Sequence, residues 1–464
     1  MMEDKIKNPY RVTVEDVVIK KFDGSYPMSI FPQFVEFVLY QSVFSPILKA
    51  QLVIYDAINL LNSYPLVGEE TVEVYLIQEG ARYSTEAMKV KLTFVITGIH
   101  NIEFGSAGRD QTYFVELHSA EAFENAKRRV SKAYKTADIK PNINDILTNY
   151  LQSTKEVKFS TEENSSVVER VVVVPNLNPL SALTWLSKLI TPLDITQYHN
   201  FIFYETIAGT SSRFNFKPFQ YQTWRDTDSE EAARRGSEAH PYFYIANYAM
   251  VNSSQIAMEG MAREGFVEER IILNVKINKR YSVLEKIIGG YFDNEFVEIN
   301  LDQKDYKIIN NTVKDQWRSL YYQKYLNTNN YIDNVINTNA EVETSPSVKY
   351  AFFNFSYPEK QDENFKLRWG KYQISKAAFS QIDLSIDVNT NLQLVPGDLI
   401  YLNIPEMHGF EESKHDRYMT GWFMITENKM IIRSSGETTM LLRVNKDSYM
   451  SPIDDKSAYG LEKR

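Results

Sequence analysis

A pattern of alternating hydrophobic and polar residues occurs twice in this chain, once near its start and once near its end. The first copy begins at Phe44 and reads FSPILKAQLVIYDAINLLNSYPLVGEETVEVYLI, and the second begins at Phe379 and reads FSQIDLSIDVNTNLQLVPGDLIYLNI. Apolar residues two positions apart are typical of half-buried strands. Each copy therefore predicts a strand, a polar connection, a turn and a second strand.

The turns in the two copies share proline, glycine and a carboxylate, and we interpret them as structural sites of a duplicated module. The turn residues are Pro65, Gly68 and Glu69 in the first copy and Pro396, Gly397 and Asp398 in the second. Each copy continues into an apolar segment, LTFVITGI or GWFMITENK, and ends in an alternating one, QTYFVEL or ETTMLLRV. Strands broken by such turns predict a small antiparallel barrel or sandwich. Duplication of this module favours an architectural role over chemistry.

Two helices are expected directly after the first copy. The segment SAEAFENAKRRVSKAYK, residues 119–135, predicts a helix with Ser119 as its N-cap and basic residues at its end. A second, short helix follows Pro141, because apolar residues then recur on one helical face. These residues are Ile143, Ile146, Leu147 and Leu151.

A strand, a helix and a hairpin come next. The continuous valines of ERVVVVPNL, residues 169–177, indicate a strand buried on both faces. NPLSALTWLSKLI predicts a helix that Asn178 caps and Pro179 opens, with Leu180, Leu183, Leu186 and Ile190 as its apolar stripe. FIFYET and SRFNFKP, joined by a turn at Gly209, predict a hairpin packed on this helix.

The segment between this hairpin and the second copy is mixed. Residues 222–239 are polar and carry charges of both signs, which predicts an exposed loop or a short surface helix. Ile272, Val275 and Ile277 alternate with polar residues. Residues 326–340 are rich in asparagine, which favours turns, and we place the major insertion within roughly 290–350.

The fold class expected from these patterns is α+β, mainly β, with two antiparallel β-barrel domains and inserted mixed α/β domains. The expected divisions are a first barrel over 1–118, a helix-rich mixed α/β domain over 119–250, a mixed β region with the asparagine-rich insertion over 251–370, a second barrel segment over 371–447 and a C-terminal tail over 448–464.

Composition narrows the classes of function. The formal charge of −9 and the isoelectric point near 5.4 argue against sequence-independent phosphate binding, which depends on lysine and arginine displacing counterions. The chain has no cysteine, which excludes disulfides and thiolate chemistry. No apolar run reaches the roughly 20 residues that span a bilayer, and MMEDKIKNPYRV lacks the apolar stretch of a signal peptide. We therefore expect no membrane insertion and assembly in the cytoplasm.

Motifs for catalysis or for cofactor binding are absent from the sequence. It has no GxSxG, HExxH, Walker A or GxGxxG pattern. His408 and His415 lie close together among acidic residues, but an exposed hairpin tip is the favoured interpretation over a metal site. Adjacent carboxylates on a strand point to opposite faces, which makes the three acidic pairs poor acid–base candidates. These pairs are Glu268–Glu269, Glu411–Glu412 and Asp454–Asp455. We therefore expect no enzyme activity, no metal and no cofactor.

The order of elements over about residues 30–447 resembles that of the baseplate central hub proteins of contractile-tailed phages. The resemblance is carried by IYDAINLLNSYPLVGEETVEVYLI, PNLNPLSALTWLSKLI followed by FIFYET, LVPGDLIYLNIP, and FMITENKMIIRSSGETTMLLRV. The chain also resembles, more distantly, the N-terminal half of type VI secretion spike proteins. The resemblance rests on the order of the elements; residues 290–350 have no clear counterpart in it, and the polar segment 222–239 is unusually long.

The resemblance implies a homotrimer in which each chain contributes two tail-tube-like barrels to a pseudo-sixfold ring in the virion baseplate. Such a ring adapts the sixfold tail tube to the threefold central spike, contacts neighbouring wedge proteins and lets DNA pass without specific binding. We add the hypothesis that carboxylates facing the channel repel the DNA phosphates.

Alternative functions stay open. They are a hub of a phage-derived contractile injection system and, more distantly, a carbohydrate-processing enzyme or binding module on a β scaffold. Genes for capsid and terminase, or for toxin and ATPase, beside this one would separate phage from injection system.

Overall fold

The structure is a computed structural model of the chain. It describes residues 12–78, 87–105, 108–134, 139–159, 172–189, 201–218, 247–249, 272–280, 282, 284, 293–300, 304–312, 348–354, 382–404, 416 and 419–446. The predictions for residues 222–239 and 326–340 lie outside the described residues, as do His408, His415 and the three acidic pairs.

Strands dominate the described residues, and the helices are few and short. The strands of the main sheet are β1 (Val12–Lys20), β2 (Met28–Ser29), β3 (Phe34–Ser42), β4 (Lys49–Asp56), β5 (Thr71–Gln78), β6 (Met88–Phe104), β7 (Gln111–Ser119), β13 (Asn247–Ala249), β14 (Ile272–Lys279), β18 (Ile382–Val388), β19 (Leu399–Asn403), β20 (Gly421–Arg433) and β21 (Thr438–Lys446). The other strands are β8 (Val130–Tyr134), β9 (Val157–Phe159), β10 (Val172–Leu177), β11 (Phe201–Ala208), β12 (Ser211–Pro218), β15 (Asp293–Asn300), β16 (Asp305–Thr312) and β17 (Val348–Asn354). The helices are α1 (Leu60–Ser63), α2 (Glu121–Lys127), α3 (Ile139–Asp145) and α4 (Pro179–Leu189), with a 3-10 turn at Phe31–Gln33 and a π-helical turn at Ile146–Tyr150. The expectation of a mainly β, antiparallel protein is confirmed.

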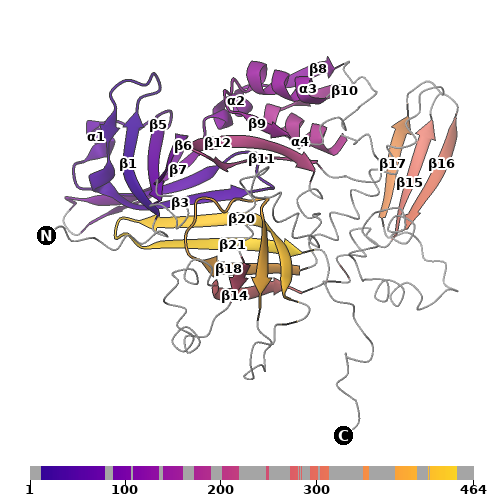
Figure 1. Cartoon of the computed structure of the whole chain (residues 1–464). Coiled ribbons are helices and arrows are strands. Elements are labelled where there is room, and N and C mark those ends of the chain that lie inside the picture. Colours follow the sequence, from indigo (N-terminus) through magenta and orange to yellow (C-terminus); the bar gives the residue numbers. More distant parts are fainter. Residues whose placement is uncertain are drawn as a thin grey trace, which may run out of the picture.

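One 13-stranded sheet contains strands of both sequence copies. Its order is β14-β18-β21-β20-β3-β4-β7-β6-β5-β1-β2, and β19 pairs with β20 and with β13. The copies meet where β20 pairs with β3, and Figure 1 shows these two strands side by side in the middle of the molecule. The two modules expected from the sequence therefore form one continuous hydrogen-bonded sheet.

The two copies have the same internal strand order. In the first copy the order is β3-β4-β7-β6-β5, and in the second it is β14-β18-β21-β20-β19. The registers agree as well, since Leu52 lies opposite Val115 and the corresponding Ile386 lies opposite Leu442. The second repeat includes β14, a strand more than a hundred residues before β18 in the chain.

Irregularities of the ladder also recur at corresponding places. The pairing of β3 with β4 shifts between Phe34 and Glu36, and that of β14 with β18 shifts between Ile272 and Asn274. A β-bulge of this kind bends its strand and increases the local twist. The repeat thus extends to the curvature of the strands.

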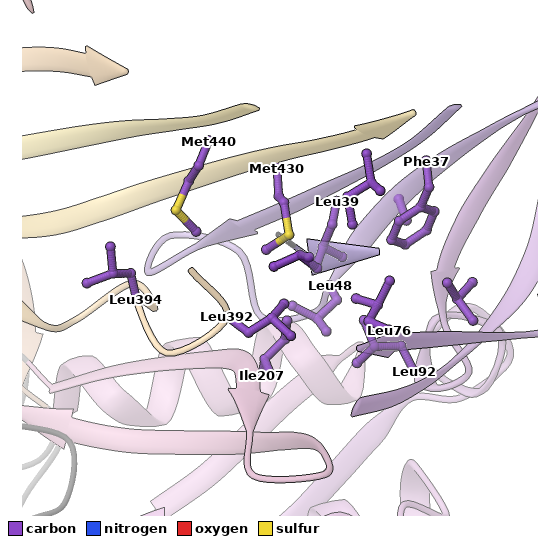
Figure 2. Packing of buried hydrophobic residues seen from close by; sticks show 14 of the residues in the cluster. Phe37, Leu39, Leu48, Leu76, Leu92, Ile207, Leu392, Leu394, Met430 and Met440 are labelled. Carbon is purple, nitrogen blue, oxygen red and sulfur yellow. The ribbon is translucent and has the colours of Figure 1, made fainter. Parts of the chain in front are cut away.

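A single hydrophobic core lies on one face of the sheet and is shared by the two repeats. Figure 2 shows Met430 of the second repeat packed beside Leu39 of the first, with Met440 farther along the same cluster. Ile207 from β11 and Leu392 from the loop before β19 enter the same cluster. Burial of such side chains contributes about 1.5–3 kcal/mol each. The two repeats therefore stabilise each other.

A second core belongs to a helix-rich unit that follows the first repeat. This unit contains α2, α3, α4, the β8–β10 ribbon and the three-stranded sheet β11-β12-β9, which gather along the upper side of Figure 1. The predicted hairpin of β11 and β12 is confirmed, with Gly209 at φ 59° in its turn. The predicted stripe of α4 is buried at Leu180, Leu183 and Leu186. A separate three-stranded sheet, β16-β15-β17, lies apart from the main sheet in Figure 1.

The prediction of one helix over residues 119–135 is wrong. Helix α2 ends at Lys127, and β8 begins at Val130, which is buried and pairs with β10. Arg128 is already extended, with φ −114° and ψ 156°. Pairing with β10 outweighs the helical preference of this segment, because propensities are small beside tertiary contacts. Ser119 lies at the end of β7 and does not cap α2.

Two further expectations are corrected. Strand β10 alternates between buried and exposed residues, so Val173 faces solvent and burial on both faces is wrong. The side chain of Asn178 donates to the carbonyl of Asn125 instead of capping its own helix, and the Asn125 side chain accepts the Leu180 N–H. The first turn of α4 is thus capped from α2. The predicted helix after Pro141 begins earlier, at Ile139, and its four apolar residues are buried.

A buried ionic cluster joins the helix-rich unit to the first repeat. The Glu205 carboxylate on β11 accepts the Leu48 N–H at 2.9 Å and the Ser119 hydroxyl at 2.6 Å, both from the main sheet. The Lys155 ammonium bridges Glu205 at 2.6 Å and Glu121 at 2.7 Å. Burial opposes the charge on Lys155, but the two carboxylates outweigh it and raise its pKa. This cluster fixes the position of β11 on the sheet.

Replacing Lys155 by methionine is expected to destabilise the protein by about 3–5 kcal/mol, because two buried carboxylates lose their counter-charge. Urea unfolding of the intact chain measures the change. Lys132→Met is the matched control, since its partner Asp145 lies at 2.9 Å but the lysine side chain is 44% exposed. The control should cost at most about 1 kcal/mol. Equal losses in the two variants would contradict a structural role for the cluster.

Candidate functional site

Within the described residues, the structure forms no group of three or more histidine, aspartate or glutamate side chains able to hold a metal ion. None of the helices in this part of the chain is both long and apolar enough to span a membrane. The features that the structure does assemble are the repeated turns, the junction between the repeats and the borders of the main sheet.

The glycines of both predicted turns occupy the left-handed region of the backbone. Gly68 has φ 96° and Gly397 has φ 94°, conformations that side chains with a Cβ rarely adopt. The Pro65 carbonyl accepts a hydrogen bond from the Lys21 ammonium, and Glu69 is exposed. Pro396 is buried. The turn residues chosen from the sequence thus lie at two corresponding corners of the sheet.

Glu70, one residue beyond the predicted Glu69, organises the first turn. Its buried carboxylate accepts the N–H groups of Val67, Gly68 and Glu69 at 3.0–3.2 Å and receives the Lys21 ammonium at 3.2 Å. Burial alone would raise the pKa of Glu70, but the backbone donors and Lys21 outweigh burial and lower it. This carboxylate therefore stabilises the turn in its ionised form.

The second turn repeats the arrangement with Asp398. Its carboxylate accepts the N–H of Val395, three residues earlier, at 3.3 Å, as Glu70 accepts that of Val67. The carbonyls of Glu70 and Asp398 then accept the N–H groups of corresponding strand residues, Ile96 and Ile425, each at 2.9 Å. Each turn is thus fastened to the middle of the following long strand. The spacing of Val67 to Glu70 and of Val395 to Asp398 is the sequence signal that would have identified Glu70.

A threonine marks a bulge beside each of these attachment points. The ladder shifts between Ile96 and Gly98 in β6, and between Ile425 and Glu427 in β20. The Thr97 hydroxyl donates to the Glu116 carbonyl at 3.3 Å, and the Thr426 hydroxyl donates to the Arg443 carbonyl at 3.0 Å. The pairing of β20 with β19 ends at Met424, and its pairing with β3 begins at Glu427. The bulge is therefore the point where the strand changes its neighbour.

The junction between β20 and β3 combines backbone pairing with a buried apolar layer. On the core face, Met430 lies opposite Leu39 and Ile432 lies opposite Phe37, and all four side chains are buried. On the other face, the Arg433 guanidinium contacts the Glu36 carboxylate at 2.8 Å. The side chains of β20 and β3 therefore match on both faces: apolar residues pack together on the core face, and opposite charges meet on the other.

The face of the sheet opposite the core is open and carries paired charges. A hollow crosses it over the junction, lined by Tyr40, Ser42, Asn278, Ser385, Glu427, Lys429 and Arg443 among others. The Arg443 guanidinium lies 2.6 Å from Asp383 and 3.5 Å from Glu427. Its hydrogen bonds to Asp383 raise the pKa of Arg443. The charges in this hollow are largely compensated.

The sequence matches no known protein-family model and no curated protein. The structure, in contrast, aligns with the tail protein from Neisseria meningitidis MC58, with a TM-score of 0.52 over 94% of this chain and 98% of that chain at 11% identity. The chain has a tail-protein fold. The resemblance to tail and baseplate proteins expected from the sequence is confirmed at the level of the fold.

Two other solved structures align with this tail-protein fold at lower scores. The 43 kDa tail protein of prophage MuSo2 from Shewanella oneidensis has a TM-score of 0.49 at 9% identity, with 92% of this chain and 97% of that chain covered. An Escherichia coli component of the type VI secretion system has a TM-score of 0.43 at 9% identity, with 96% and 80% covered.

Replacing Glu70 by glutamine is expected to destabilise the protein at pH 7 by about 1.5–3 kcal/mol, because three backbone donors and Lys21 lose an ionised acceptor. The pKa of Glu70 is lowered by folding, so its contribution is present above the unfolded pKa and is lost as the pH falls through the folded one. Urea midpoints should therefore differ at pH 7 and converge in acid.

Glu69→Gln is the matched control, since the same chemical change is made at an exposed neighbour. It should alter stability by less than about 0.5 kcal/mol. If the difference in urea midpoint between Glu70→Gln and the native protein stayed constant from pH 7 into the acid range, the charge of Glu70 would not contribute to stability.

Proposed function

We propose that the protein is a structural component of a phage tail, the hub of a contractile baseplate. Three copies form a ring that adapts the sixfold tail tube to the threefold central spike and lets DNA pass. The single observation that carries this proposal is the duplicated module, in which two repeats with the same strand order and the same bulges share one sheet. The tail-protein fold supports it.

The duplication supports a symmetry adapter for a geometric reason. A chain with two similar modules presents six similar units when three copies assemble, while everything present once per chain recurs three times. Closed rings of identical chains are the usual form of soluble oligomers. The described helix-rich unit with α2, α3 and α4 follows the first repeat, and would give such a ring three protrusions.

The division of the chain proposed for this role follows the boundaries expected from the sequence, except that β14, at Ile272–Lys279, is part of the second repeat. Each repeat is a tail-tube-like barrel domain, and between the repeats lie the helix-rich mixed α/β domain at residues 119–250 and the mixed β region with the asparagine-rich insertion at residues 251–370. The inserted regions contact the spike and the wedge proteins, and the ring contacts the tail tube. The location is the virion baseplate, after assembly in the host cytoplasm.

The open face of the sheet lines the channel in this proposal, because the core and the helix-rich unit occupy the other face. Phosphate binding needs uncompensated lysine and arginine. Arg443 and Arg433 on this face are each paired with carboxylates, at 2.6 Å and 2.8 Å. Paired charges let DNA pass without specific binding. This arrangement replaces pure carboxylate repulsion as the favoured explanation.

Light scattering of the purified protein, alone and after co-expression with the spike protein encoded nearby, tests the proposal. We expect a mass three times that of the 53.9 kDa chain, or a complex with three copies of each protein. A monomer at every concentration that also ignores the spike would contradict the ring. Activity on polysaccharides by such a monomer would instead favour an enzyme on a β scaffold.

A further inference from the structure

Two borders of the main sheet have no strand beside them within the described residues. The distal half of β6, from Gly98 to Phe104, pairs with β7 alone, since its pairing with β5 ends at Val95. Strand β14 pairs with β18 alone and lies at the border of the sheet in Figure 1. Exposed strand edges are templates for further pairing, and proteins usually cover or blunt them.

Comparison of the two repeats shows that these two borders correspond to the two strands of the β20–β3 junction inside the chain. The distal half of β6 corresponds to the part of β20 that pairs with β3, because both follow the threonine bulge. Strand β14 corresponds to β3, because Val275 and Phe37 lie opposite the equivalent residues Ile386 and Leu52. The two borders are therefore the two halves of a second junction of the same kind.

Apolar side chains are exposed at β6 positions whose counterparts are buried in the junction. Met430 and Ile432 of β20 are buried, whereas Ile102 and Phe104 of β6 are 45% and 74% exposed. Asn101 has a positive φ of 52° and adds one residue to β6, which keeps Ile102 and Phe104 on the core face. The strand thus preserves an apolar layer that nothing in the described chain covers.

The other border shows the same contrast. Leu39 of β3 is fully buried against β20, whereas the corresponding Ile277 of β14 is 51% exposed. Val275, which corresponds to the buried Phe37, is only partly buried. The core of the second repeat is therefore incomplete along β14.

We propose that the distal half of β6 in one copy pairs with β14 of a second copy of this chain, so that the contact between copies repeats the β20–β3 junction inside each chain. This proposal rests on the ring proposed above and assigns its interface. The occupant is a second copy because each chain carries both halves of the contact but joins only the other pair internally. Such a head-to-tail contact closes into a ring when its rotation allows.

The internal junction fixes the expected register of this contact. Lys429 lies opposite Tyr40 inside the chain, and Tyr40 corresponds to Lys279, because β14 has one extra residue at Asn278; this places His100 of one copy opposite Lys279 of the next. The same alignment brings Ile102 opposite Ile277 and Phe104 opposite Val275. Glu103 then lies opposite Lys276, an attractive pair of opposite charges. Apolar layer and charge pair both favour this register.

Disulfide cross-linking tests the contact directly, since the chain has no cysteine of its own. In the double variant His100→Cys with Lys279→Cys, the opposed Cβ atoms are expected about 4.5–5.5 Å apart, within reach of a disulfide. Oxidation should give covalent dimers and trimers on a non-reducing gel. Lys429→Cys with Tyr40→Cys is the matched control, because that pair occupies the same position inside the chain and should link without raising the mass.

A shifted pair checks the register. His100→Cys with Asn274→Cys moves one partner five positions along β14 and, because of the extra residue at Asn278, keeps it on the same face, so this pair should not link. A trimer by light scattering in which the His100 and Lys279 positions stay unlinked while the internal control links would overturn this interface and leave the proposed ring standing. Efficient linking of the shifted pair would overturn the register. A monomer in all conditions would overturn both the ring and the interface.

A second variant removes the apolar contact without disturbing the fold. Phe104→Ser should weaken assembly about tenfold or more, because a buried phenylalanine side chain is lost from the contact. Phe22→Ser is the matched control, since Phe22 is a phenylalanine of similar exposure in the turn that follows β1. Both variants should keep the far-ultraviolet spectrum of the native protein. Equal assembly of the two variants would count against burial of Phe104 between copies.

Discussion

The antiparallel pairing of β20 with β3 is the interaction on which the rest of the structure depends. It turns two β repeats into one sheet, and it buries Met430 and Ile432 against Leu39 and Phe37 in a core that neither repeat completes alone. Backbone hydrogen bonds form the link, and they do not depend on the identity of most side chains. Two repeats can therefore diverge in sequence and still join in the same way, provided that the layer beneath the pairing stays apolar.

The features that the repeats do keep are those that steer the backbone. A turn carboxylate, Glu70 or Asp398, reaches back three residues and fastens the turn to the following strand. A threonine, Thr97 or Thr426, then supports a bulge from which the long strand leaves one neighbour and becomes available to another. A bulge bends its strand and ends regular pairing, so its position decides where a neighbouring sheet can attach. Each repeat thus fixes its attachment point locally, through a few hydrogen bonds.

The sequence predicts local elements better than distant partnerships. Alternation predicted β4, β7, β18 and β21, because one face of each strand is buried and the other is not. Alternation could not assign β14 to the second repeat, because β14 lies far from β18 in the chain and an alternating pattern does not show which strand it pairs with. Residues 119–135 read as one helix because nothing local shows that Val130 pairs with Leu177. The role of Glu70 was missed for a similar reason, since two adjacent glutamates differ only in which one the turn buries.

Divergence between the repeats follows from what surrounds each of them. Asn428 is buried in the second repeat because its amide donates to the Leu394 carbonyl, whereas the corresponding Ile99 is an apolar residue at the margin of the shared core. The helix-rich unit is fastened to the first repeat by Glu205, which binds Leu48 and Ser119 of that repeat. The two repeats are therefore similar sheet segments in different environments. In the proposed ring, the pairing of strands would follow an approximate sixfold pattern while side chains and attached units follow a threefold one. A symmetry adapter needs this combination, because backbone pairing can repeat six times only if side-chain differences do not interrupt it.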